Sequence, residues 1–160
     1  MLLALKNLLF TVLIPGTVAG YLPWMLTRGE SQGWAAGTAL ALLLFAAGGA
    51  IYFWCLWDFA SFGRGTPAPI DAPKKLVVRG LYRYTRNPMY VGVLTVILGW
   101  TVLSGVLGLL LYAAFVGTCF QLFIVYYEEP QLSRTFGKSY DEYRARVGRW
   151  LPRIGRGSSA

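Results

Sequence analysis

The stretch Gly80–Gly92, with the sequence GLYRYTRNPMYVG, joins a polar, arginine-bearing segment to the longest uncharged run of the chain. That run, Asn87–Tyr127, is 41 residues long. At about 1.5 Å of rise per residue, a helix of that length would extend about 60 Å, enough to cross a ~30 Å hydrocarbon core twice. Ser104-Gly105 is a turn signal inside the run. We therefore expect a helical hairpin with arms near Met89–Leu103 and Val106–Tyr127.

Two further uncharged runs precede this stretch. Asn7–Thr27 has 21 residues and Ser31–Trp57 has 27, and each is long enough for one membrane crossing. The chain is 56% hydrophobic and only 14% charged, unlike an average soluble domain. The sequence predicts an all-α integral membrane protein with about four transmembrane helices and a C-terminal amphipathic helix on the cytoplasmic side. We divide this single domain into two spans (1–58), a cytoplasmic loop (59–87), the hairpin (88–127), a cofactor-capping helix (128–152) and a tail (153–160).

The basic residues are distributed unevenly about these spans. Of the 15 Lys and Arg that give a net charge of +8, only Arg28 lies in the loop between the first two spans. The other 14 lie on the opposite side, and the positive-inside rule places that side, with both termini, in the cytoplasm. We expect a multi-pass protein of a bacterial-type inner membrane. Topology and attraction to anionic lipid account for the charge without nucleic acid as a partner.

The segments around the hairpin are expected to differ in regularity. Pro15-Gly16 should bend the first span. Asp58 should mark where the second span leaves the hydrocarbon, and glycines and prolines make Ala60–Arg79 a folded loop. After Pro130, apolar residues recur at spacings of 4, 4, 3 and 4, which predicts one face of a helix that lies on the membrane or caps a site there: Leu132, Phe136, Tyr140, Tyr143 and Val147.

The inventory of reactive side chains excludes several kinds of chemistry. The chain has no histidine, so a Ser-His-Asp or Cys-His arrangement is impossible. Cys55 and Cys119 fall inside predicted spans and are expected to be buried packing residues. No carboxylate cluster resembles a metal site, and no residue stands out as an obligatory acid or base.

Two sets of polar residues leave two interpretations open. The pair Glu128-Glu129 can simply end the last span and bind Arg83 or Arg86, or it can accept hydrogen bonds from a ligand. The second set has five members within nine residues: Tyr82, Arg83, Tyr84, Arg86 and Tyr90. These side chains suit an interfacial aromatic belt, and they equally suit a site for a ligand carboxylate beside the N-terminus of a helix.

Leu76-Val77, Gly80-Leu81-Tyr82 and Arg86–Gly92 together resemble the signature of the isoprenylcysteine carboxyl methyltransferase family, much of which the related phospholipid methyltransferases share. The later half of that pattern is present too, in Glu128-Glu129, Leu132, Phe136-Gly137, Tyr140, Tyr143, Val147 and Leu151-Pro152. The resemblance covers about 76–152. It implies an integral membrane enzyme that binds S-adenosylmethionine near the cytoplasmic face.

The resemblance also assigns residues. It places cofactor contacts at Leu76, Val77, Tyr82, Asn87, Pro88, Met89, Tyr90, Glu128 and Glu129, and we add Arg83 and Arg86 as candidate substrate-binding residues. Asn87 stands where many members have histidine, and it can still donate a hydrogen bond. Ile124 stands where the eukaryotic isoprenylcysteine enzymes have an arginine tied to their substrate.

The expected function is S-adenosylmethionine-dependent methyl transfer to a hydrophobic or lipid-like acceptor, as in isoprenylcysteine carboxyl methyltransferases. Because the arginine is replaced at Ile124, methylation of a phospholipid amine, as by phosphatidylethanolamine N-methyltransferases, is the alternative enzyme hypothesis. A catalytically inactive scaffold that binds lipid through its basic helix is the non-enzymatic alternative. The expected partners are membrane lipids and a hydrophobic or lipid-linked substrate.

Overall fold

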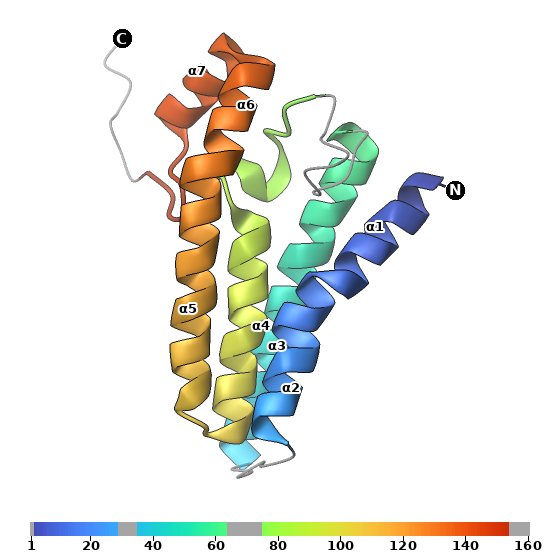
Figure 1. Cartoon of the computed structure of the whole chain (residues 1–160), viewed down its shortest axis with the longest axis vertical. Coiled ribbons are helices and arrows are strands. Elements are labelled where there is room, and N and C mark those ends of the chain that lie inside the picture. Colours follow the sequence, from blue (N-terminus) through green and yellow to red (C-terminus); the bar gives the residue numbers. More distant parts are fainter. Residues whose placement is uncertain (1, 29–34, 64–74, 154–160) are drawn as a thin grey trace.

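The structure, a computed structural model, describes residues 2–28, 35–63 and 75–153. It is all-helical in these ranges, as predicted, and its long helices run side by side as a bundle (Figure 1). The expected loop between the first two spans, the middle of the 59–87 loop and nearly all of the tail lie outside the described residues.

The first span is one bent helix. Helix α1 (Leu2–Leu13) continues through a wider π-type turn (Thr17–Tyr21) into α2 (Leu22–Thr27). Figure 1 shows α1 leaning away from the bundle that α2 joins. The bend lies at Pro15-Gly16, as expected, because proline has no N–H to donate to the preceding turn.

The second span is longer than predicted. Helix α3 (Ala35–Asp58) runs on through a π-type turn, Phe59–Gly63, where we expected a loop to begin. The segment continues the helix because its first proline comes only at Pro67, and Ser61 donates a hydrogen bond to the carbonyl of Trp57 at 2.6 Å. Asp58 therefore lies within the helix, buried, in an ion pair with Arg79 at 3.0 Å.

The predicted hairpin is confirmed. Helix α4 (Pro88–Ser104) is followed by a turn at Gly105, whose φ of 69° suits glycine, and then by α5 (Gly108–Phe123). Among the described residues, three helices have the length and composition to cross a membrane: Leu5–Thr27, Gly37–Gly63 and Gly108–Phe136. At 17 residues α4 is a shorter apolar helix, about 25 Å long.

Helices α3 and α4 approach closely at two glycines. A Cβ atom at Gly92 would lie 2.9 Å from the carbonyl oxygen of Gly48, and one at Gly48 would lie 2.7 Å from the carbonyl oxygen of Gly92. Small residues permit such contacts between membrane helices. The adjoining core is built from Tyr52, Cys55, Val77, Tyr82, Met89, Val93 and Ile97. Cys55 is buried as predicted, but Cys119 is exposed on the outer face of α5, so its predicted burial is wrong.

The predicted single C-terminal helix is wrong. After α5, a π-type turn (Ile124–Glu128) leads to α6 (Glu129–Phe136), and α7 (Lys138–Arg146) follows. Gly137 separates α6 from α7 because its φ of 52° and ψ of −128° are not helical. The predicted apolar set nevertheless stays together: Tyr140, Tyr143 and Val147 pack with Leu76, Leu132 and Phe136. This apolar face therefore packs within the protein.

Candidate functional site

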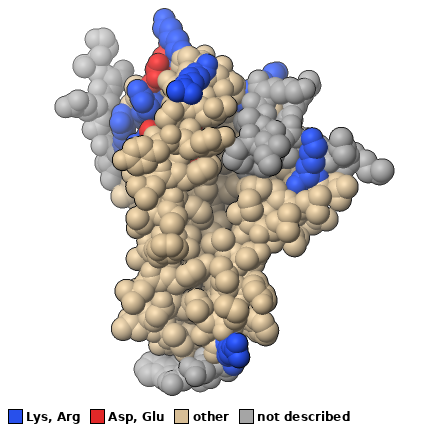
Figure 2. Space-filling model, in the orientation of Figure 1, with Lys and Arg blue, Asp and Glu red and all other residues tan. Residues whose placement is uncertain are grey.

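The candidate site lies at the end of the bundle that carries α6 and α7, where the N-terminus of α4 meets the end of α5 (Figure 1). Basic side chains gather around this end (Figure 2). The backbone enters it through a 3₁₀ turn, Gly80–Arg83, and Pro88 occupies the first turn of α4. That position suits proline, whose missing N–H has no partner in a first helical turn.

Glu128 and Tyr90 form a direct pair. The Tyr90 hydroxyl donates a hydrogen bond of 2.9 Å to Oε2 of Glu128, across 38 residues of sequence. The Tyr90 ring packs against Phe120 with centroids 4.5 Å apart, which fixes its direction. Glu128 closes the π-type turn, and such turns shift the face on which a side chain emerges and often lie at functional sites.

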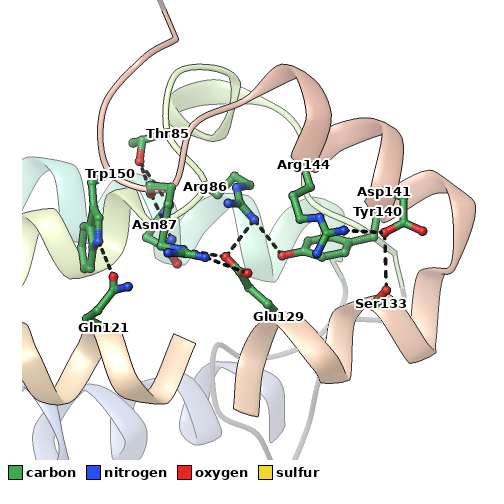
Figure 3. Close-up of polar contacts among 11 residues, drawn as sticks. Thr85, Arg86, Asn87, Gln121, Glu129, Ser133, Tyr140, Asp141, Arg144 and Trp150 are labelled. Atoms are coloured by element: carbon green, nitrogen blue, oxygen red, sulfur yellow. Dashed lines mark hydrogen bonds and ion pairs between the residues drawn. The ribbon is translucent and has the colours of Figure 1, made fainter. Parts of the chain in front are cut away.

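Glu129 has a different environment. Arg149 donates two hydrogen bonds to its carboxylate, at 2.8 and 3.0 Å, and Nη1 of Arg86 lies 2.9 Å from Oε1 (Figure 3). The same Nη1 donates to the hydroxyl of Tyr140 at 3.0 Å. The pairing that the sequence suggested with Arg86 is therefore present, while Arg83 is exposed and takes no part in this cluster.

A segment of which sequence reasoning singled out only Val147, and which it expected to be helical, holds these parts together. This segment, Val147–Trp150, is called the strap below. Its carbonyl groups accept hydrogen bonds from the loop before α4: Gly148 from the Arg86 N–H at 2.9 Å, and Arg149 from Thr85 Oγ1 at 2.9 Å and Asn87 Nδ2 at 3.0 Å. Trp150 Nε1 donates to Gln121 Oε1 of α5 at 2.7 Å (Figure 3). The strap and the loop before α4 are more than 60 residues apart in sequence, so local spacing gives no signal of their contact.

Two hollows adjoin this framework. A cavity of about 20 Å³, room for a single water, is lined by Arg86, Asn87, Ile124, Glu128, Glu129, Leu132, Tyr140 and Tyr143. A groove of about 490 Å³, which we call the polar groove, is lined by Leu76, Val78, Arg83, Ser139, Glu142, Tyr143, Arg146 and Val147. Tyr143 borders both hollows.

Tyr143 is held as a neutral donor. Its hydroxyl donates to the carbonyl of Tyr82 at 2.7 Å, and burial raises its pKa above the ordinary value of tyrosine. Burial also raises the pKa of Tyr140, against the opposing effect of the Arg86 charge. The hydrogen bonds to Glu129 raise the pKa of Arg149. At neutral pH these tyrosines are therefore protonated and the guanidinium is charged.

The structure brings some of the predicted site residues together and separates others. Asn87, Glu128 and Glu129 line the cavity, and Tyr90 is bound to Glu128. Leu76 and Arg83 line the polar groove. Val77, Tyr82 and Met89 are core residues, and Pro88 is buried at the start of α4. Arg86, predicted to bind substrate, has a side chain only 8% exposed and is bound to Glu129.

Comparison with protein families gives one match. The family model described as phospholipid methyltransferase matches residues 36–139, more than half of the chain. The chain belongs to the phospholipid methyltransferase family. The matched region runs from α3 to the start of α7, so it contains the Tyr90–Glu128 pair and Glu129, whereas the strap lies beyond it. No curated protein and no solved structure matches.

Membership supports the broader part of the sequence-based expectation. The phospholipid methyltransferase family is a family of membrane methyltransferases, in agreement with the apolar helices. It is related to the isoprenylcysteine carboxyl methyltransferases whose signature the sequence resembles. The specific assignment to the isoprenylcysteine enzymes has no support from the match.

Proposed function

We propose that the protein transfers a methyl group from S-adenosylmethionine to a lipid-like acceptor at the cytoplasmic face of the membrane. The observation that carries this proposal is the Tyr90–Glu128 pair, a carboxylate held by a tyrosine where two apolar helices end. A carboxylate at such a depth is costly in a membrane protein, and it is usually retained for function.

The described residues fit the cofactor in three respects. The polar groove has a volume of about 490 Å³, within the range of about 300–1,000 Å³ for small-molecule sites. Leu76 and Val78 give it an apolar wall, while Arg83 and Arg146 provide positive charge for a carboxylate. The buried Nε of Arg86 has no hydrogen-bond partner within the described residues, so a donor is available beside Glu128.

When bound, S-adenosylmethionine supplies a methyl group that is already activated by its positive sulfur. The protein therefore needs to align the acceptor and exclude water more than it needs a strong acid or base. In our proposal the carboxylate of Glu128 accepts hydrogen bonds from the ligand, and the hydroxyl of Tyr90 fixes that carboxylate. The strap covers the loop before α4 and restricts water.

We propose an aminophospholipid, of the phosphatidylethanolamine type, as the acceptor to test first. The description of the matched family favours it, and Ile124, buried beside Glu128, provides no charge for a prenylcysteine carboxylate. An ammonium group would be attracted by Glu128, which can also accept the proton that the amine must lose before it attacks. The carboxylate of an isoprenylated cysteine is the second candidate acceptor, because the sequence motif resembles that of the isoprenylcysteine enzymes.

The test uses the full chain in lipid nanodiscs with a radiolabelled methyl donor. Label in mono- and dimethylated phosphatidylethanolamine supports the proposal, and label only in the ester of a prenylcysteine analogue supports the second candidate. Calorimetric titration with S-adenosylhomocysteine addresses the non-enzymatic scaffold. No binding by folded protein, together with no methyl transfer, would exclude the enzyme hypothesis.

A further inference from the structure

A second groove lies on the membrane-facing flank of the hairpin. It has a volume of about 330 Å³ and is lined by Leu94, Ala114, Gly117, Thr118, Gln121 and Trp150. We call it the apolar groove. Gly117 contributes no side chain to its floor, and a Cβ atom there would only reach ordinary contact with the methyl groups of Leu94, at 3.8 Å. An elongated apolar group therefore has room beside Gly117.

The apolar groove leads toward the candidate site. Leu94 lies one helical turn after Tyr90 on α4, about 6 Å further along the axis. Gln121 is next to Phe120, whose ring packs on Tyr90. A molecule with its tail along Leu94 and Gly117 would thus extend toward the end of the bundle where Tyr90 binds Glu128.

The end of the apolar groove nearest the site is polar. Trp150 walls it there, and its indole nitrogen is bound to Gln121 at 2.7 Å. Tryptophan is typical of the boundary between hydrocarbon and headgroup. Its neighbour Arg149 is bound to Glu129, so the wall of the groove and the site belong to one hydrogen-bonded framework. The groove thus has an apolar end at hydrocarbon depth and a polar end beside the site.

We propose that the apolar groove binds an acyl chain of the aminophospholipid acceptor and so positions its headgroup at Glu128. This inference rests on the proposed function. The occupant is an acyl chain because α5 belongs to a helix long and apolar enough to cross a membrane, and because the groove wall at Trp150 adjoins Arg149, which binds Glu129. A fixed chain restricts the headgroup, which is how binding energy remote from a reacting atom assists a reaction.

The experiment uses the full chain in nanodiscs that contain phosphatidylethanolamine with a photoreactive diazirine in one acyl chain. After illumination and proteolysis, the label is expected on the peptide that contains Gly117 and Gln121. Gly117→Leu should lower labelling there about tenfold, and should raise KM for the lipid by a similar factor with little change in kcat or in S-adenosylhomocysteine affinity, because the leucine occupies the space of the chain.

Two variants control for damage to the helix. Gly49→Leu adds the same side chain on α3, where nothing lies within 4 Å of the added Cβ, and should leave labelling of α5 and KM unchanged. Gly117→Ala should retain most of the labelling, since its methyl group contacts Leu94 at an ordinary distance. If Gly49→Leu raises KM as much as Gly117→Leu does, the groove has no special part and the proposal is overturned.

The remaining outcomes separate the groove from the proposed function. Methyl transfer to phosphatidylethanolamine without label on α5 would overturn the proposal that the apolar groove binds the acyl chain, and it would leave the proposed function intact. Equal labelling by photoreactive phosphatidylglycerol, which has no amine, would mean that the groove holds any surrounding lipid, and would overturn its role as an acceptor site. An absence of both methyl transfer and S-adenosylhomocysteine binding would overturn the proposed function.

Discussion

Glu128 and Glu129 are neighbours in sequence, yet the structure gives their carboxylates different partners. Glu129 belongs to an ion cluster in which the guanidinium groups of Arg86 and Arg149 both bind its carboxylate, and Arg86 also donates to the hydroxyl of Tyr140. Glu128 instead accepts a hydrogen bond from Tyr90, and both carboxylates border the small cavity. Two identical residues at one helix end thus differ in their bonding, and under our proposal Glu129 holds the fold while Glu128 binds the ligand.

The largest expected effect concerns the ion cluster around Glu129. Glu129→Ala removes the anion from a cluster in which Arg86 is buried, and losing one partner of a buried ion pair typically costs about 3–5 kcal/mol. We expect a marked fall in the thermal midpoint in detergent and faster proteolysis of the segment 129–153. Glu128→Ala is the matched control. If it destabilises the protein as much, the proposed division between the two carboxylates is wrong.

This division explains what could be predicted from the sequence. The apolar helices, the bend at Pro15-Gly16 and the hairpin at Gly105 follow from local composition and were predicted correctly, although the second span runs on to Gly63. The pairing of Tyr90 with Glu128 depends on the hairpin, which returns the end of α5 to the start of α4, and the motif placed both residues in one site. These features can be predicted from the uncharged runs and the turn-forming residues of the sequence.

Other features are not local. The strap binds Thr85 and Asn87 through the backbone carbonyl of Arg149, and a carbonyl leaves no mark in the sequence. The break at Gly137 was missed because apolar residues on both sides keep a helical spacing, although the chain turns there. The prediction that Cys119 is buried failed for a similar reason. In a membrane span, apolar residues face lipid as well as protein, so apolar character does not show which face is buried.

The second prediction addresses the Tyr90–Glu128 pair, which we propose binds the ligand. Tyr90→Phe removes the hydrogen bond to the Glu128 carboxylate while it keeps the ring on Phe120. Hydrogen bonds to charged groups contribute about 1.5–3 kcal/mol, so methyl transfer should fall about 10- to 100-fold. Binding of S-adenosylhomocysteine, measured by calorimetry, should weaken, while the thermal midpoint changes less than in Glu129→Ala. If Tyr90→Phe has normal turnover and ligand binding, the Tyr90–Glu128 pair is not part of the functional site.

The third prediction concerns the strap. Arg149→Lys keeps the positive charge but cannot reproduce the two parallel hydrogen bonds to Glu129. We expect a loss of about 1–2 kcal/mol in unfolding free energy, smaller than for Glu129→Ala because Arg86 still binds the carboxylate. Thermal unfolding in detergent measures this effect. Ligand affinity should be retained, so a loss of affinity equal to that of Tyr90→Phe would assign the strap to the ligand site.

The smallest effect is expected at an ion pair that involves neither Glu128 nor Glu129. Arg144 and Asp141 form an ion pair of 3.6 Å on α7, with both side chains about half exposed. Exposed pairs contribute about 0–1 kcal/mol because water and salt screen them, so Asp141→Asn should change the thermal midpoint little, and less still at high salt. Burial is the difference between this pair and the cluster around Glu129, since both join a carboxylate to arginine. If Asp141→Asn proved as damaging as Glu129→Ala, burial would not be what makes the Glu129 cluster structural, and the contrast with Glu128 would need another cause.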